Sequence, residues 1–125
     1  MSSWRVSLVS LICRSDAKRN QLPRRVARLG QECLKAGEEV EVNFIGTGTR
    51  WPGEMSKVGH PLNALYNSVR EMVKAGSCGC AAAFGATESL KACGIPEAKD
   101  NAVAGTPGVL SIRKYLKEGW NTLVF

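Results

Sequence analysis

The sequence contains a single histidine, His60, among its 125 residues. A zinc site would have to combine His60 with thiols, and the spacing of the cysteines fits no familiar zinc module. Also missing are a Ser/His/Asp arrangement for nucleophilic catalysis and a pair of carboxylates placed for acid–base chemistry. We therefore expect no metal and no cofactor. His60 precedes Pro61 at a predicted helix start, where capping or packing is its ordinary role and acting as a thiol's base is the alternative.

Long hydrophobic runs are absent as well. A membrane-spanning helix needs ~20 apolar residues, and the apolar stretch over residues 6–13 is far shorter. It also lacks a small-residue cleavage site, so we expect neither a signal peptide nor a membrane partner. These absences predict a cytoplasmic protein. Its five cysteines are odd in number and irregularly spaced, which argues against a disulfide framework and favours reduced thiols.

The excess of basic residues does not come with the other marks of a nucleic-acid-binding protein. The net charge is +6, and six of the basic side chains crowd into residues 14–28. No aromatic residue lies among them and no DNA- or RNA-binding motif is visible, so we expect no nucleic-acid partner. A solvated helix face is the ordinary explanation of this cluster. An acidic protein partner or an anionic substrate is the alternative.

Predicted strands and helices alternate along a single domain, residues 1–125. The strands are expected at 6–13, 39–45, 78–84, 102–104 and 122–125, and the helices at 22–37, 61–76, 88–93 and 106–119. Such alternation predicts right-handed crossovers and a parallel sheet with helices on both faces. The fold class is therefore α/β: a three-layer α/β/α domain whose doubly wound, mostly parallel sheet has four to five strands.

Ligands of such sheets bind beyond the carboxyl ends of the strands. Three segments are predicted to meet there: the region of Arg14, the turn with Gly46, Thr47 and Gly48, and the end of the strand that carries Cys80. Together with His60, these residues are the candidate substrate-binding set. The Gly-Thr-Gly-Thr turn begins an irregular connection expected over 46–60. It does not match a nucleotide-binding fingerprint, so a turn folded over the sheet edge is favoured over a phosphate site.

Two cysteines, Cys78 and Cys80, are the candidate catalytic residues. Their neighbours are almost all Gly, Ala and Ser, which leaves room for a substrate or a second sulfur. A thiol reacts as the thiolate, and a helix N-terminus or basic groups nearby lower its pKa. Residues two apart on a strand point to the same face, so both thiols are expected to face alike, with Cys80 nearer the following helix and better stabilised as the thiolate. The alternative is that both pack inertly in a core or a subunit interface.

Three further segments point to a family. They are Cys80-Ala-Ala-Ala-Phe-Gly85, Leu90-Lys-Ala-Cys-Gly-Ile95-Pro96 and the ending Gly119-Trp-Asn-Thr-Leu-Val-Phe125, joined by the 46–51 turn and His60-Pro61. In this order and spacing the chain resembles the DsrE/DsrF-like family of sulfur-relay proteins. The commonest family pattern has its cysteine at the position of Ala86. In the branch that this chain follows, the cysteine is at the position of Cys80 and a second one lies three residues earlier, whereas here Cys78 lies two earlier.

The resemblance implies a doubly wound fold, a homo-oligomer and a cysteine that carries a persulfide. On this basis the expected function is a sulfur carrier or sulfurtransferase, with Cys80 accepting sulfane sulfur, Cys78 assisting or resolving, and an acidic protein as donor or acceptor. The alternative is a non-catalytic homo-oligomeric module that binds a small anion or a partner protein. We also expect self-association from the residues themselves, because the Ala/Gly-rich strand and an exposed Trp51 would offer apolar surface. Cys33, on a predicted core face, and Cys93, beside Gly94, are expected to be structural.

Overall fold

The computed structural model describes residues 4–10 and 21–125. Its centre is a five-stranded sheet in the order β4-β3-β2-β1-β5, in which every neighbouring pair is parallel. The strands are β1 (Arg5–Ser10), β2 (Glu39–Phe44), β3 (Val73–Ser77), β4 (Glu97–Ala98) and β5 (Asn121–Val124). The helices are α1 (Gln21–Lys35), η1 (Gly46–Arg50), α2 (Trp51–Met55), α3 (Asn63–Val69), η2 (Arg70–Met72), α4 (Cys78–Ala83), α5 (Thr87–Ala92) and α6 (Ile112–Lys117).

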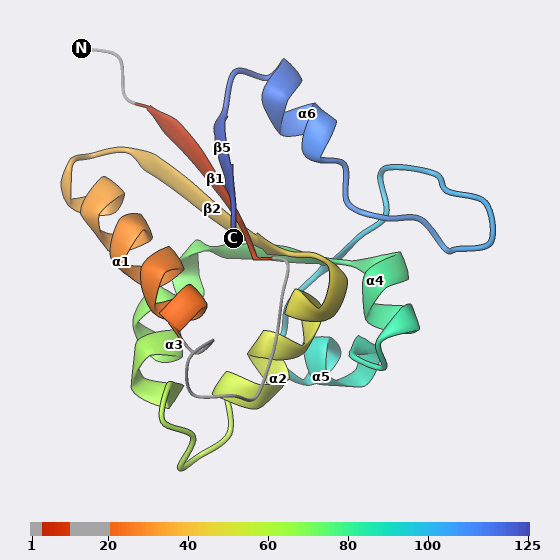
Figure 1. The fold of residues 1–125 in the computed structure, drawn as a ribbon, viewed down its shortest axis with the longest axis horizontal. Coiled ribbons are helices and arrows are strands. Elements are labelled where there is room, and N and C mark those ends of the chain that lie inside the picture. The colour runs from red at the N-terminus through yellow and green to blue at the C-terminus, as the bar shows by residue number, and fades with distance from the viewer. Residues whose placement is uncertain (1–3, 11–20) are drawn as a thin grey trace.

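The two faces of the sheet are covered by different helices (Figure 1). Along β2, Val40 and Val42 belong to the buried core on the side where α1 packs against β1 and β2. Glu41 and Asn43 alternate with them and point to the opposite face, where both hydrogen-bond the Tyr115 hydroxyl of α6. Helices therefore lie on both sides of a parallel sheet. The predicted three-layer α/β/α fold is confirmed.

The first half of the chain follows its hydrophobic pattern closely. The helix expected from Leu22 is α1, and Gly37 ends it with a φ of 83°. The strand expected over 39–45 is β2, and the one expected over 6–13 contains β1. Residues 11–13 of that prediction lie outside the described part of the chain. β1 is buried along nearly its whole length because it pairs with β2 on one side and β5 on the other.

The segment expected to be irregular, 46–60, is largely helical, and that prediction was wrong. It forms η1 and then α2, whose first residue, Trp51, is only 2% exposed. An aromatic side chain of this size contributes strongly to a core, so burying Trp51 and Met55 holds the segment against the sheet edge. Trp51 therefore adds nothing to the exposed apolar surface, contrary to expectation.

The third strand begins about where the preceding helix was expected to continue. Val73 follows the helical spacing of Val69, but the helix tightens into η2 and the chain enters the sheet at Val73. Gly76, expected to end a helix, lies within β3, where a Cβ atom would come within 2.7 Å of Leu90 Cδ1. The close approach of α5 to the strand, rather than a helix end, explains this glycine.

The last third of the chain differs from expectation in two places. The short strand is β4, at Glu97–Ala98, and not residues 102–104. The last helix does not start at Thr106-Pro107, because Thr106 closes a turn with its hydroxyl bonded to Val103 O and Gly108 N. Instead Ser111 caps α6 by accepting a hydrogen bond from Lys114 N, and Leu116, expected inward, is 60% exposed. The final strand, β5, lies as predicted.

Within residues 4–10 and 21–125, no helix combines the length and the apolar composition needed to cross a membrane.

Candidate functional site

The two candidate cysteines lie on a helix and not on a strand. β3 ends at Ser77 and α4 begins with Cys78 at the next residue, so the prediction of a strand over 78–84 was wrong. The run Cys-Gly-Cys-Ala-Ala-Ala contains three alanines, the residue with the best helix propensity. Ser77 is fully buried and its hydroxyl accepts a hydrogen bond from Leu110 N at 3.0 Å. The cysteines nevertheless lie where ligands of parallel sheets bind, beyond the carboxyl end of a strand.

This helical geometry separates the two thiols. Each residue of a helix is rotated by about 100° around the helix axis relative to the one before it. Residues two apart are therefore rotated by roughly 200°, and their side chains point to nearly opposite sides of the helix. The expectation that Cys78 and Cys80 share a face depended on the strand and was wrong. Direct reaction between their sulfurs would require the first turn of α4 to open.

A backbone contact holds the Cys78–Cys80 turn in place. Gly79 N donates a hydrogen bond of 2.7 Å to Gly108 O. A Cβ atom on Gly79 would lie 2.8 Å from Val109 Cγ1 and 3.0 Å from Gly108 O, so this turn fits only a residue without a side chain. Ala81, on the other side of α4, is fully buried. The cysteines flanking Gly79 are both partly exposed on a turn anchored from two sides.

Cys78 lies beside an acidic side chain that the sequence did not single out. The Glu97 carboxylate of β4 raises the pKa of Cys78, chiefly by hydrogen bonding to its thiol, and burial adds to the effect. The positive charges of Lys99 and Lys91 lower the pKa of Cys78, but their effect is smaller and the pKa stays raised overall. One carboxylate oxygen, Glu97 Oε1, is buried and has no hydrogen-bond partner. A raised pKa keeps Cys78 as the neutral thiol, the less nucleophilic form.

The Gly46–Arg50 segment and α4 come together as predicted for the sheet edge. η1 packs against α4, and Arg50 Nε donates to Phe84 O at 3.0 Å while its guanidinium lies 5.6 Å from the centre of the Phe84 ring. Inside η1, Thr49 Oγ1 donates to Gly46 O and Gly48 N donates to Ile45 O. These contacts describe a compact turn that closes over the edge of the sheet, the interpretation favoured for this motif over a phosphate site.

The remaining predicted site residues do not join this cluster. Arg14 lies outside the described residues. His60 Nδ1 accepts a hydrogen bond of 3.1 Å from Leu62 N, so the imidazole stabilises the turn before α3, while α3 itself has no side-chain cap hydrogen bond. The connection between α2 and α3 that carries it lies at the bottom of Figure 1, far from α4 on the right. The structure therefore does not place His60 beside the cysteines.

The other two described cysteines differ in their surroundings. Cys33 is buried in α1 within the core, and burial followed by hydrogen bonding to Glu38 raises its pKa to about 11. This agrees with the structural role expected for it. Cys93, at the end of α5, is partly exposed and donates a hydrogen bond to Ser56 Oγ.

Sequence reasoning missed Glu97 and Gly108, which flank Cys78 and Gly79. The Thr-Pro-Gly-Val run at 106–109 is typical of a turn, and this was the available signal. A helix start, the prediction made for this run, does not bring it back to α4. For Glu97 there was no signal, because its place depends on β4 pairing with Gly76 and Ser77 of β3.

A scan against protein-family models finds no match, and a search of curated proteins finds no relative. Among solved structures, the chain is similar to a conserved protein of unknown function from Bacteroides thetaiotaomicron. That similarity has a TM-score of 0.53 and 16% identity, and it covers 95% of this chain and 94% of the other. At this identity the likeness concerns the fold alone.

Proposed function

We propose that this protein carries sulfane sulfur as a persulfide on Cys80. The observation that supports it best is the place of this thiol: it is partly exposed and lies on the first turn of α4, the helix that begins directly after the carboxyl end of β3. The hydrogen bond from Gly79 to Gly108 fixes that turn, and the small side chains around Cys80 leave access for a second sulfur. The resemblance of the residues around Cys80 to sulfur-relay proteins points the same way.

The transfer needs no oxidant or reductant beyond the donor itself. The Cys80 thiolate attacks the outer sulfur of a donor persulfide. A new S–S bond forms at Cys80 Sγ, the donor's S–S bond breaks, and the donor leaves as a thiolate. A thiolate of the acceptor then attacks the outer sulfur on Cys80, which restores the Cys80 thiolate. The protein is in this proposal a carrier between two other thiols.

Cys78 has a supporting role in this proposal rather than a resolving one. Its side chain points away from that of Cys80 on α4, and the Glu97 carboxylate keeps it protonated. Persulfide on Cys80 is therefore protected from attack by its nearest thiol in the sequence. The sulfur stays available for an acceptor on another molecule.

We further propose that the carrier acts in the cytoplasm as a homo-oligomer with an acidic donor or acceptor protein. Apolar side chains are exposed on the edge strand β5, where Leu123 is 46% and Val124 is 53% exposed. Such surface favours association of copies. On α1, the side chains of Arg24, Arg25 and Arg28 are exposed and provide positive charge for an acidic partner.

The test is sulfur loading followed by mass spectrometry. Reduced protein is incubated with a sulfane-sulfur donor, and the intact protein and its peptides are weighed. We expect the added mass of one sulfur atom on the peptide containing Cys80, removable by dithiothreitol as a persulfide is and a sulfinic acid is not. The adduct should be lost in Cys80→Ser and retained in the matched control Cys78→Ser.

Two results would overturn the carrier proposal. One is a wild-type protein that takes up no sulfur, which would leave the binding-module alternative. The other is a full adduct in both serine variants, which would place the sulfur on a different cysteine. Light scattering of the same samples measures self-association, and a strictly monomeric species at micromolar concentration would contradict the proposed oligomer.

A further inference from the structure

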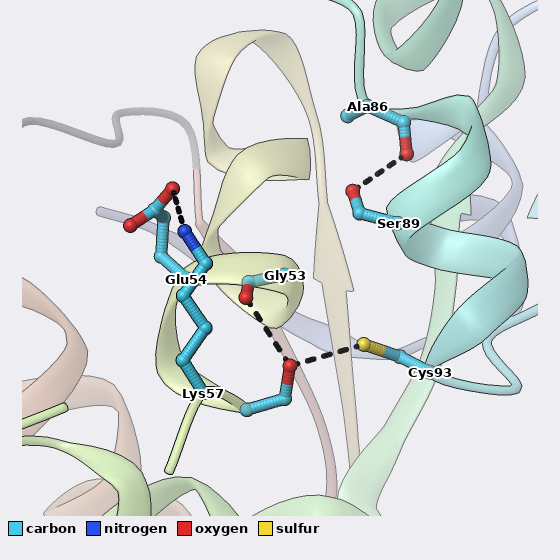
Figure 2. A network of polar contacts seen from close by, with 7 residues as sticks. Gly53, Glu54, Lys57, Ala86, Ser89 and Cys93 are labelled. Atoms are coloured by element: carbon cyan, nitrogen blue, oxygen red, sulfur yellow. Dashed lines mark hydrogen bonds and ion pairs between the residues drawn. The ribbon is translucent and has the colours of Figure 1, made fainter. Parts of the chain in front are cut away.

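A second thiol site lies away from the Cys78–Cys80 turn, where the ends of α2 and α5 meet. Cys93 directly follows α5 and Ser56 directly follows α2. The Cys93 sulfur points across to Ser56, donating a hydrogen bond of 3.5 Å to Ser56 Oγ, and Ser56 Oγ donates in turn to Gly53 O at 3.2 Å (Figure 2). A thiol proton, a hydroxyl and a carbonyl thus form one continuous chain.

The backbone at this position is clamped, so the thiol is held in a fixed direction. Arg70 Nη2 donates to Cys93 O and to Gly94 O, both at 3.1 Å. Gly53 of α2 also approaches α5 so closely that a Cβ atom on it would lie 2.7 Å from Ser89 Cβ. The cysteine is partly exposed at the surface of this closely packed junction.

Tyr66 of α3 completes the cluster with a hydroxyl group that has only a weak partner. Its side chain is only 3% exposed, and the Cys93 thiol is the group that the hydroxyl contacts, through a hydrogen bond to sulfur. Yet the hydroxyl makes no hydrogen bond of ordinary geometry. Buried hydroxyl groups are nearly always hydrogen-bonded, and an exception needs an explanation. The reduced thiol donates its proton to Ser56, and its sulfur is a weak hydrogen-bond acceptor. The Tyr66 hydroxyl proton therefore has no strong acceptor.

One added oxygen on the Cys93 sulfur would satisfy every group in this cluster. The oxygen of a sulfenic acid, Cys–S–O–H, accepts a hydrogen bond from the Tyr66 hydroxyl. Its own proton donates to Ser56 Oγ, which continues to donate to Gly53 O. The chain then runs from Tyr66 through the new oxygen and Ser56 to Gly53 with each donor paired.

We propose that Cys93 is a peroxide-sensing thiol whose sulfenic acid is stabilised by the hydroxyl groups of Tyr66 and Ser56. The oxidant is a hydroperoxide, ROOH. The Cys93 sulfur attacks its terminal oxygen, which keeps its hydrogen as the sulfenic O–H. An S–O bond forms as the O–O bond breaks, and the thiol proton passes to the leaving alkoxide, which becomes ROH. The sulfur loses two electrons and the peroxide gains them. This proposal does not depend on the persulfide proposed for Cys80.

The test traps the sulfenic acid chemically. The reduced full chain is treated with substoichiometric hydrogen peroxide and then, after increasing delays, with dimedone, and the labelled peptides are quantified by mass spectrometry. We expect dimedone on the Cys93 peptide, decaying slowly with the delay. Tyr66→Phe should shorten the lifetime of the sulfenic acid by about fivefold, the equilibrium effect of one typical hydrogen bond. Alkylation of reduced Cys93 by iodoacetamide should proceed at the same rate in both proteins.

Tyr115→Phe is the matched control, because it removes a tyrosine hydroxyl from the opposite face of the sheet, bonded to Glu41 and Asn43. It should leave the lifetime at Cys93 unchanged. If Tyr66→Phe does not fold, Ser56→Ala tests the same chain from an exposed position and should also shorten the lifetime. A Cys93 peptide that stays unlabelled overturns the proposal. So does a lifetime that is equal in wild type and in the folded member of these two variants.

Discussion

Gly79 and Gly108 are joined by a backbone hydrogen bond of 2.7 Å between Gly79 N and Gly108 O. It connects the first turn of α4 to the loop that leads into α6, two segments far apart in the sequence. Gly108 has a φ of 111° and lies so close to the backbone of Lys99 that a Cβ atom on it would come within 2.7 Å of Lys99 O. The position of Cys78 and Cys80 therefore depends on two glycines that permit close backbone contact.

Gly79→Ala is expected to destabilise the protein by about 1–3 kcal/mol, because the added methyl group would overlap Val109 and the Gly108 carbonyl. The free energy of unfolding in urea measures this. The control is Ala82→Ser on the exposed side of the same helix, which should change it by no more than about 0.5 kcal/mol. Equal free energies of unfolding for Gly79→Ala and wild type would show that the 106–109 turn does not pack closely against α4.

A second contact joins α6 to the sheet. The Tyr115 hydroxyl donates to Glu41 Oε2 at 2.7 Å and accepts from Asn43 Nδ2 at 2.9 Å. Asn43 is fully buried, and its Oδ1 atom already lacks a partner. Tyr115→Phe would leave the side-chain nitrogen of Asn43 unpaired too. We expect this to lower the free energy of unfolding by about 1–3 kcal/mol.

Chemical denaturation of Tyr115→Phe beside Asn43→Ala and the double variant checks this contact. The two single losses should add up to more than the loss in the double variant, because the residues share one hydrogen bond. Strict additivity would mean that the Tyr115 hydroxyl and Asn43 do not stabilise each other, and that the loss in Tyr115→Phe comes from the hydrogen bond to Glu41.

The sequence was sufficient for the architecture and for the edge of the sheet where the cysteines lie. The strand β2 and the helix α1 have strong hydrophobic patterns that are set locally, and both lie close to their predicted ranges. The start of β1 also agrees with the prediction, whose last residues, 11–13, lie outside the described part of the chain. β3 has a weak pattern, Val-Lys-Ala-Gly-Ser, and its place in the sheet depends on pairing with β2 and on Leu90 packing over Gly76. The spacing of neighbouring residues in the sequence does not show such long-range contacts. The predicted strand, 78–84, therefore lies several residues after β3.

That shift changed the interpretation of the candidate site. A strand would have put the thiols of Cys78 and Cys80 side by side, whereas the helix points them apart. Glu97 reaches Cys78 only because β4 pairs with the end of β3, a contact between segments that sequence patterns do not connect. The sequence therefore identified the candidate residue types, and the tertiary contacts determine which of them lie together.

The last prediction concerns the two tyrosines of the chain, Tyr66 and Tyr115. Burial, followed by the nearby Cys93, raises the pKa of Tyr66 from its ordinary value of 10.0 to about 12. Burial and the hydrogen bond to Glu41 raise the pKa of Tyr115 as well. Both folded-state values lie above the unfolded ones, so the unfolded chain releases these protons first as the pH rises. Their contribution to stability is complete below about pH 10 and is lost as the pH increases through the folded-state values.

We therefore expect no tyrosinate absorbance near pH 10 while the protein is folded, and a free energy of unfolding that falls steadily between pH 10 and about 12. Ultraviolet titration of the native protein measures the first, and urea unfolding at a series of alkaline pH values measures the second. The same titration in concentrated urea should show both tyrosines ionising at the ordinary pKa. A native protein that titrates like the denatured one would contradict the burial of both hydroxyl groups, and comparison with Tyr66→Phe and Tyr115→Phe would show which tyrosine is responsible.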